Sequence, residues 1–131
     1  MSTSKERRYI NLPNRRGNLP YSDAVLSGDT LYIAGRIGFK PGTREVPEDP
    51  AEEARLMLDG VRSVLSQAGM QINDLVYVQI FCSDMSLFDT FNGVYRQYFS
   101  GELPARAFIG SGPLLFGARF EIIGIAERKK T

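Results

Sequence analysis

Apolar and polar side chains alternate through residues 22–35, SDAVLSGDTLYIAG, on either side of a short polar break. Successive side chains of an extended chain point to opposite faces, so Leu31 and Ile33 share one face and Tyr32 lies on the other. The break at residues 27–29, SGD, has the composition of a tight turn. This pattern predicts a β-hairpin.

The next apolar positions have helical spacing. They recur every three or four residues, at Ala54, Met57, Leu58, Val61, Val64, Leu65 and Ala68. Asp49 followed by Pro50, with Glu52 three residues after Asp49, is typical of a capped helix start. Gly69 can end the helix in a left-handed conformation. We therefore expect an amphipathic helix whose apolar face packs on a sheet.

The remaining segments predict two further strands around a second helix, and then a last strand. Residues 74–84, DLVYVQIFCSD, are rich in β-branched and aromatic side chains, which is typical of a strand. Residues 86–99 have an aromatic stripe at helical spacing, at Phe88, Phe91, Tyr95 and Tyr98. Strands are also expected within residues 105–110 and 119–127, separated by the segment SGPLLFG. The order ββαβαββ predicts an α+β fold, with a mixed sheet and both helices on one face.

The last predicted strand is apolar on both faces. Glu121 and Ile123 fall on one face, and Phe120 and Ile122 fall on the other. Two helices can cover only one face of the sheet. We therefore expect other copies of the chain to cover the second face, in a homo-oligomer.

Length and composition indicate one globular domain. The chain has 131 residues, of which 43% are hydrophobic and 24% are charged. We expect a single domain over residues 1–131, with residues 1–17 as an extended or partly ordered N-terminal segment. No apolar run is long enough for a membrane span or a signal peptide, which predicts a cytoplasmic protein. The formal net charge of +1 offers little attraction for nucleic acid, and the basic clusters near both ends are typical of solvated tails.

The histidine and cysteine counts exclude several kinds of site. There is no histidine, so catalytic triads and dyads that use imidazole and the HExxH zinc motif are excluded. Cys82 is the only cysteine, which excludes an internal disulfide and a zinc site with several cysteines. Any proton transfer must therefore use Asp, Glu, Tyr, Lys, Cys or water. We expect Cys82 to be a buried apolar residue without a functional role.

Two charged residues interrupt otherwise apolar strands. Arg106 lies in ARAFIG and Glu121 lies in RFEIIGIAE, and long charged side chains are seldom fully buried without a partner. One interpretation is a structural ion pair that braces adjacent strands. The other is a site in which the guanidinium binds a carboxylate and the carboxyl group transfers protons. The two residues alone do not distinguish these interpretations.

Four segments resemble the reactive-intermediate deaminase family, RidA, also called YjgF. They are LPYSDAVLSGDTLYIAGRIG, DLVYVQIFCSDMSLFDTFNGVYRQYF, LPARAFIG and FEIIGIAE, and the resemblance runs from about residue 18 to residue 126. Several motifs in the right order and spacing are more specific than any one of them. The resemblance implies a chorismate-mutase-like fold and a homotrimer with clefts between subunits. It also implies hydrolytic deamination of reactive enamines and imines, such as 2-aminoacrylate, to 2-keto acids and ammonia, without a metal or an organic cofactor.

The resemblance assigns expected roles to Arg106 and Glu121. Arg106 is expected to hold the substrate carboxylate with two parallel hydrogen bonds. Glu121 is expected to act as general base and acid. Its apolar neighbours should raise the pKa of Glu121 by desolvation, and Arg106, if nearby, should lower it.

The family pattern also marks pocket residues. Tyr21, Gly35 and Asn92 are expected to line the pocket, with Phe108 at a position where many members have cysteine. Ala34 replaces a common serine, and Arg36 stands where glutamine is common. The implied pocket is therefore more apolar and differently charged, which affects the range of substrates.

Two alternative functions belong to other classes. The first is a small-carboxylate-binding or regulatory trimer in which Arg106 binds its ligand without turnover. The second is an RNA-directed activity, as a ribonuclease or translation inhibitor, which the near-neutral charge disfavours.

Overall fold

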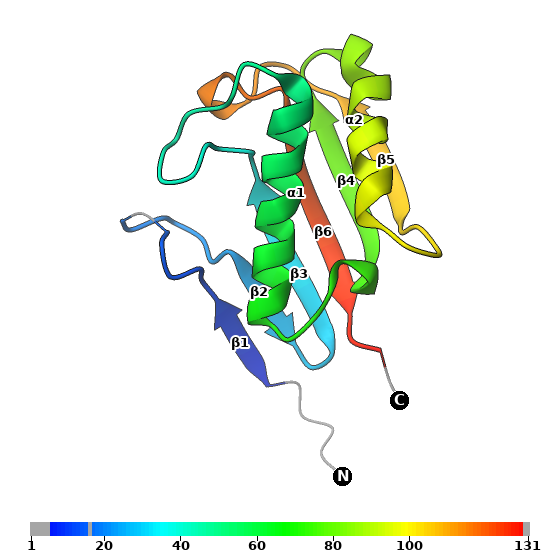
Figure 1. Cartoon of the computed structure of the whole chain (residues 1–131). Coiled ribbons are helices and arrows are strands. Elements are labelled where there is room, and N and C mark those ends of the chain that lie inside the picture. Colours follow the sequence, from blue (N-terminus) through cyan, green and yellow to red (C-terminus); the bar gives the residue numbers. More distant parts are fainter. Residues whose placement is uncertain (1–5, 16, 130–131) are drawn as a thin grey trace.

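A six-stranded mixed sheet with two helices on one face forms the structure (Figure 1). This computed structural model describes residues 6–15 and 17–129. The strands are β1 (Arg7–Ile10), β2 (Ala24–Ser27), β3 (Thr30–Arg36), β4 (Leu75–Cys82), β5 (Ala105–Gly110) and β6 (Phe120–Glu127), in the spatial order β1-β2-β3-β6-β4-β5. The helices are α1 (Pro50–Gln67) and α2 (Phe88–Tyr95), and short 3₁₀ turns flank α2 at Met85–Leu87 and Arg96–Tyr98. The predicted α+β fold is confirmed.

The N-terminal segment adds a strand that the sequence pattern did not predict. β1 pairs antiparallel with β2, with Arg8 opposite Leu26. Only Ile10 of its four residues is buried, which explains why its pattern gave so weak a signal. Residues 1–5 of the expected N-terminal segment lie outside the described residues. The predicted hairpin follows as β2 and β3, joined at Gly28, whose φ of 62° suits glycine.

Helix α1 begins and ends as expected. The side chain of Asp49 accepts a hydrogen bond from the Ala51 N–H at 3.1 Å, and Gly69 follows the helix with a φ of +71°. Glu52 does not complete a capping box; its carboxylate accepts from Arg55 Nε at 3.2 Å. The buried side of α1 packs on the sheet beside α2. The buried side chains of α1, α2 and the sheet form one hydrophobic core. Its largest fully buried side chains include Phe91, Phe120, Leu31, Met57, Leu58 and Leu65.

A buried carboxylate ties α1 to the start of β6. Glu53 is 0% exposed and accepts hydrogen bonds from Arg119 Nε at 2.7 Å, from the Arg119 N–H at 2.8 Å and from the Phe120 N–H at 3.2 Å. The Arg119 guanidinium also donates to the carbonyl oxygens of Pro47 and Glu48. These bonds fix the loop before α1 and the start of β6 at Arg119 and Phe120, the two residues before Glu121.

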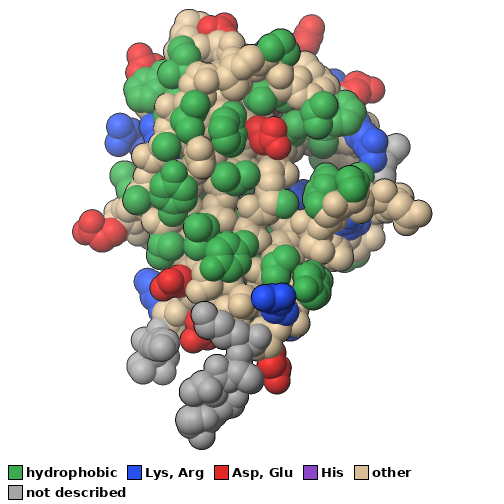
Figure 2. Space-filling view, turned by 180° about the vertical axis from the view of Figure 1, so that it is seen from behind, with side chains coloured by type: hydrophobic (Ala, Val, Ile, Leu, Met, Phe, Trp, Pro, Cys, Tyr) green, Lys and Arg blue, Asp and Glu red, His purple; other side chains and the backbone are tan. Residues whose placement is uncertain are grey.

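In the part of the chain that the structure describes, no helix covers the other face of the sheet. Val25, Tyr32, Ile125 and Tyr77 lie in one row across four neighbouring strands, and Tyr32 is 52% exposed. Figure 2 shows hydrophobic side chains spread over much of this face. We call it the helix-free face. Among the described residues, no helix is long and apolar enough to cross a membrane.

Candidate functional site

Arg106 lies on the helix side of the sheet. It pairs in register with Val78, which is fully buried beneath the helices, so both side chains point toward the helix layer. The carbon at the centre of the Arg106 guanidinium lies 4.9 Å from the ring centroid of Tyr95 and 5.2 Å from that of Phe108. Aromatic faces at these distances stabilise a cation. Phe108 itself packs edge-on against Phe88 at a centroid distance of 5.0 Å.

The guanidinium opens onto a cavity between α2 and β5. The cavity has a volume of about 220 Å³, and it is lined by Asn92, Tyr95, Arg96, Leu103, Pro104 and Arg106. We call it the Arg106 pocket. Burial lowers the pKa of Arg106, and the positive charge of Arg96 acts in the same direction.

Two neutral polar groups in the Arg106 pocket have no hydrogen-bond partner among the described residues. They are Asn92 Oδ1 and the Tyr95 hydroxyl, and both atoms are buried. Burial raises the pKa of Tyr95 to about 12, so its hydroxyl keeps its proton at neutral pH. Buried polar groups normally have partners, so these two atoms leave hydrogen-bonding capacity unused beside the cavity.

Glu121 lies on the helix-free face. It is directly opposite Phe81 on β4 and is partly buried. Its carboxylate lies against Gly35, and a Cβ at residue 35 would overlap Glu121 Oε2. Glycine at this position therefore makes room for the carboxylate. Burial raises the pKa of Glu121.

Arg106 and Glu121 do not meet within one chain. Strand β4 lies between β5 and β6, and the two side chains point to opposite faces of the sheet. Among the described residues, no ion pair joins them, and Arg106 makes no contribution to the pKa of Glu121. The interpretation as an ion pair between adjacent strands is thus wrong for the single chain, as is a lowering of the Glu121 pKa by Arg106. The alternation of side chains along one strand does not show which strands pair or in what register. The sequence pattern therefore could not show that Arg106 and Glu121 lie on opposite faces of the sheet.

The other expected pocket residues fall into separate groups. Asn92 and Phe108 lie with Arg106, whereas Gly35 lies with Glu121. Tyr21 is 50% exposed, and its ring lies 5.5 Å from the Arg15 guanidinium carbon, with no contact to either group.

Arg36 and Ala34 lie near the end of β3. Arg36 is directed to Asp23, with a guanidinium-to-carboxylate distance of 3.4 Å. The Asp23 carboxylate also accepts the Leu12 N–H at 2.8 Å. Ala34 donates its N–H to the Asp23 carbonyl oxygen at 3.0 Å. The added charge of Arg36 is therefore used to hold the loop before β2.

Sequence reasoning missed Arg96 and Tyr95 as pocket residues. Tyr95 belongs to the aromatic stripe that indicates helix core, and Arg96 follows it at the end of α2. The signal that was available is the spacing of Asn92 and Arg96, four residues apart on one helix face. It could not indicate that this face lies over Arg106.

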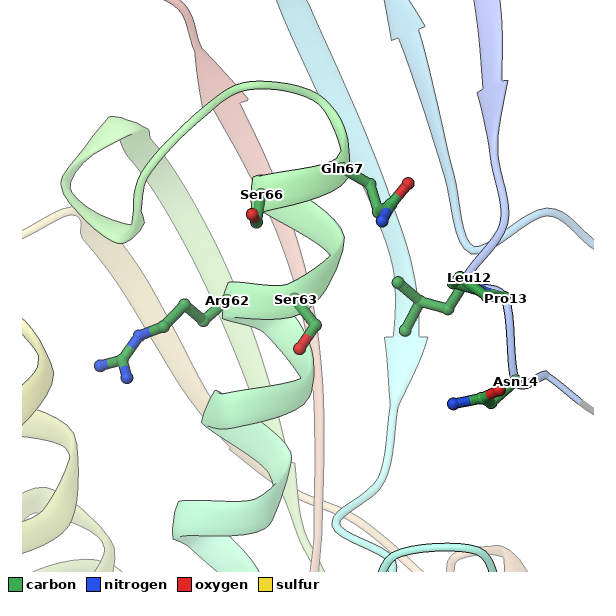
Figure 3. A pocket seen from close by; sticks show the side chains of 7 residues that line it. All are labelled: Leu12, Pro13, Asn14, Arg62, Ser63, Ser66 and Gln67. Atoms are coloured by element: carbon green, nitrogen blue, oxygen red, sulfur yellow. The ribbon is translucent and has the colours of Figure 1, made fainter.

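A second cavity lies between the N-terminal segment and α1 (Figure 3). It has a volume of about 510 Å³ and is lined by Leu12, Pro13, Asn14, Arg62, Ser63, Ser66 and Gln67. Figure 3 shows Arg62 directed away from Leu12 and Asn14. The cavity contains none of the expected site residues and none of the buried, unpartnered side-chain atoms. Within the described residues, no cluster of three or more His, Cys, Asp or Glu side chains could hold a metal ion.

Comparison with known proteins gives consistent matches over most of the chain. A family model described as endoribonuclease L-PSP matches residues 14–128. The 2-iminobutanoate/2-iminopropanoate deaminase of Mus musculus is 40% identical over 108 residues, which cover 82% of this chain and 80% of that protein.

Solved structures match in the same region. E. coli TdcF with bound serine has a TM-score of 0.87 and 30% identity, with 93% of this chain and 99% of that chain covered. The YjgF gene product of E. coli has a TM-score of 0.86 and 32% identity over the same shares. The chain therefore belongs to the RidA/YjgF/L-PSP family.

Proposed function

We propose that this protein is a cofactor-free deaminase that hydrolyses reactive enamines and imines to 2-keto acids and ammonia, in the cytoplasm. The observation that carries the proposal is the Glu121 carboxylate, partly buried against Gly35 with a raised pKa and no ion-pair partner among the described residues. A carboxyl group in that state is suited to accept and return a proton during the reaction. The similarity to a curated imine deaminase supports the same activity.

We further propose that the active site forms between subunits of a homotrimer. Arg106 and Glu121 point to opposite faces of one sheet, so a single site can contain both only if they come from different copies. The helix-free face, with its exposed hydrophobic side chains, is suited to such an assembly. Tyr21, exposed on its loop, would reach the site in the same way.

The chemistry follows from these groups. Arg106 binds the substrate carboxylate through a bidentate guanidinium contact and orients the C=N carbon. Water adds to that carbon while Glu121 accepts its proton, and the proton then passes to nitrogen. The hydroxyl group of the resulting carbinolamine gives its proton to Glu121, which passes a proton to the amino nitrogen. The carbon–nitrogen bond then breaks, ammonia leaves and the C=O bond forms. An enamine substrate first takes up a proton at carbon and loses one from nitrogen, which converts it to the imine.

A second candidate is carboxylate binding without turnover. The Arg106 pocket contains its cation, its unpartnered polar groups and its aromatic walls within one chain, without Glu121. TdcF with bound serine is a family member that holds a small amino acid. We do not propose an RNA-directed activity, because a net charge of +1 gives little attraction for a polyanion.

The test is hydrolysis of short-lived imino acids generated by an amino-acid oxidase. Wild-type protein should accelerate release of ammonia and keto acid. Glu121→Gln should reduce kcat/KM about 100-fold or more, in line with loss of a general base, and Arg106→Ala should reduce it to a similar extent. Arg62→Ala, on the outer side of α1, is the control and should retain activity. No acceleration by wild type for any imine would overturn the deaminase proposal, and binding of 2-oxobutanoate in that case would favour the second candidate.

A further inference from the structure

The Arg106 pocket contains a second guanidinium that the proposed reaction does not require. Arg96, at the C-terminal end of α2, lines the same cavity as Arg106. One carboxylate per substrate needs one bidentate partner, and Arg106 already supplies it. Arg96 is exposed and Arg106 is partly buried, so Arg96 is accessible to a second group of the same ligand.

Neither guanidinium is neutralised by a carboxylate in the part of the chain that the structure describes. Arg15, Arg36 and Arg119 each have an Asp or Glu carboxylate at ion-pair distance. Among the described residues, Arg96 and Arg106 form no such pair, and Arg96 acts on Arg106 as a like charge. Two cations around one small cavity repel each other, and an anion between them would turn this repulsion into attraction.

Two neutral side chains, Tyr95 and Asn92, add hydrogen-bonding groups to the two guanidinium groups of the pocket. Tyr95 is 4% exposed, and its protonated, unpartnered hydroxyl can donate a hydrogen bond to a carboxylate. Asn92 Oδ1 is an unpartnered acceptor and can receive a hydrogen bond from an imine or iminium N–H. The two arginines therefore line the cavity as donors suited to carboxylate oxygens, and a rotation of the Tyr95 and Asn92 side chains would add a further donor and an acceptor.

We propose that Arg96 and Arg106 each bind one carboxylate of the same ligand, so that the preferred substrates are 2-imino acids with an acidic side chain. This inference rests on the proposed deaminase function and names its substrate class. The volume of about 220 Å³ suits a small diacid, since pockets for drug-sized ligands span roughly 300–1,000 Å³. Arg106 binds the carboxylate that neutral and acidic substrates share. Arg96 binds the side-chain carboxylate of acidic substrates and is therefore the specificity-determining residue.

The experiment compares imines with neutral and acidic side chains. L-leucine and L-glutamate are converted to their imines in situ by matching oxidases, with wild type, Arg96→Ala, Arg96→Lys and the control Arg62→Ala. Arg96→Ala should lower kcat/KM for the glutamate-derived imine about tenfold or more, and should change the leucine-derived value less than about twofold. Arg96→Lys, which keeps the charge, should recover part of the loss.

Ligand binding gives a readout that does not depend on turnover. Isothermal titration calorimetry with 2-oxoglutarate and 2-oxobutanoate should show a Kd for 2-oxoglutarate about tenfold weaker in Arg96→Ala and an unchanged Kd for 2-oxobutanoate. Equal effects on both ligands, or none, would overturn the inference. If wild type hydrolyses no imine but Arg96→Ala selectively weakens 2-oxoglutarate, the two-carboxylate site stands and the deaminase proposal fails.

Discussion

At the scale of single residues, the burial of Glu121 has an electrostatic cost that depends on pH. Burial raises its pKa, which means that the folded protein favours the neutral carboxyl group. The wild type should therefore lose stability, relative to Glu121→Gln, as the pH rises through the pKa of Glu121. We expect similar melting temperatures at about pH 4 and a higher one for Glu121→Gln at about pH 7. A melting-temperature difference between the two proteins that is the same at pH 4 and pH 7 would contradict a raised pKa of Glu121.

Gly35 allows a test of where the carboxylate must lie. In Gly35→Ala the new methyl group would overlap Glu121 Oε2, the end of a flexible side chain that can move aside at little cost in stability. We expect a melting temperature close to that of wild type and a fall in kcat/KM of about tenfold or more, as for a misplaced catalytic group. Gly112→Ala, where a Cβ would meet open space, is the control. Full activity in Gly35→Ala would show that the observed carboxylate position is not needed.

At the scale of elements, the Glu53–Arg119 contact joins α1 to β6. Glu53→Ala would leave the Arg119 guanidinium and the Arg119 and Phe120 N–H groups without their acceptor. Removing one partner of a buried pair costs about 3–5 kcal/mol of unfolding free energy. Glu52→Ala, which removes an exposed contact to Arg55, should cost about 1 kcal/mol or less. Denaturant unfolding measures both, and equal losses would show that Glu53 has no special role.

Most elements were predictable because their side chains follow a clear helical or strand period. The 3.6-residue period and the Asp49 cap indicated α1, and alternation indicated β6. The sequence pattern did not predict β1 because three of its four residues are exposed.

The site was predictable only in part. Arg106 and Glu121 stand out as charges within apolar strands, but their faces depend on the pairing of β4 with β5 and β6. No pattern within one strand contains that register. Glu53 lies on the buried side of α1. The sequence pattern does not indicate that its partner is Arg119, 66 residues away.

At the scale of the whole molecule, the two sheet faces have different tasks. The helix side holds the core and the Arg106 pocket, while the helix-free face presents Glu121 among exposed hydrophobic side chains. The proposed trimer would cover this face and bring Glu121 of one copy to the Arg106 pocket of another. Its mass in analytical ultracentrifugation should be three times the 14.6 kDa of the chain.

The most direct measurement is activity in mixed oligomers of two inactive variants. Arg106→Ala and Glu121→Gln subunits, co-expressed in equal amounts and purified together through different tags, each supply what the other lacks. If each site takes Arg106 from one copy and Glu121 from another, each mixed trimer that carries both tags has one complete site among its three, so imine hydrolysis should return at about one third of the sites. If both residues act from the same copy, the mixed oligomers should be as inactive as either variant alone, and a site between subunits would be contradicted.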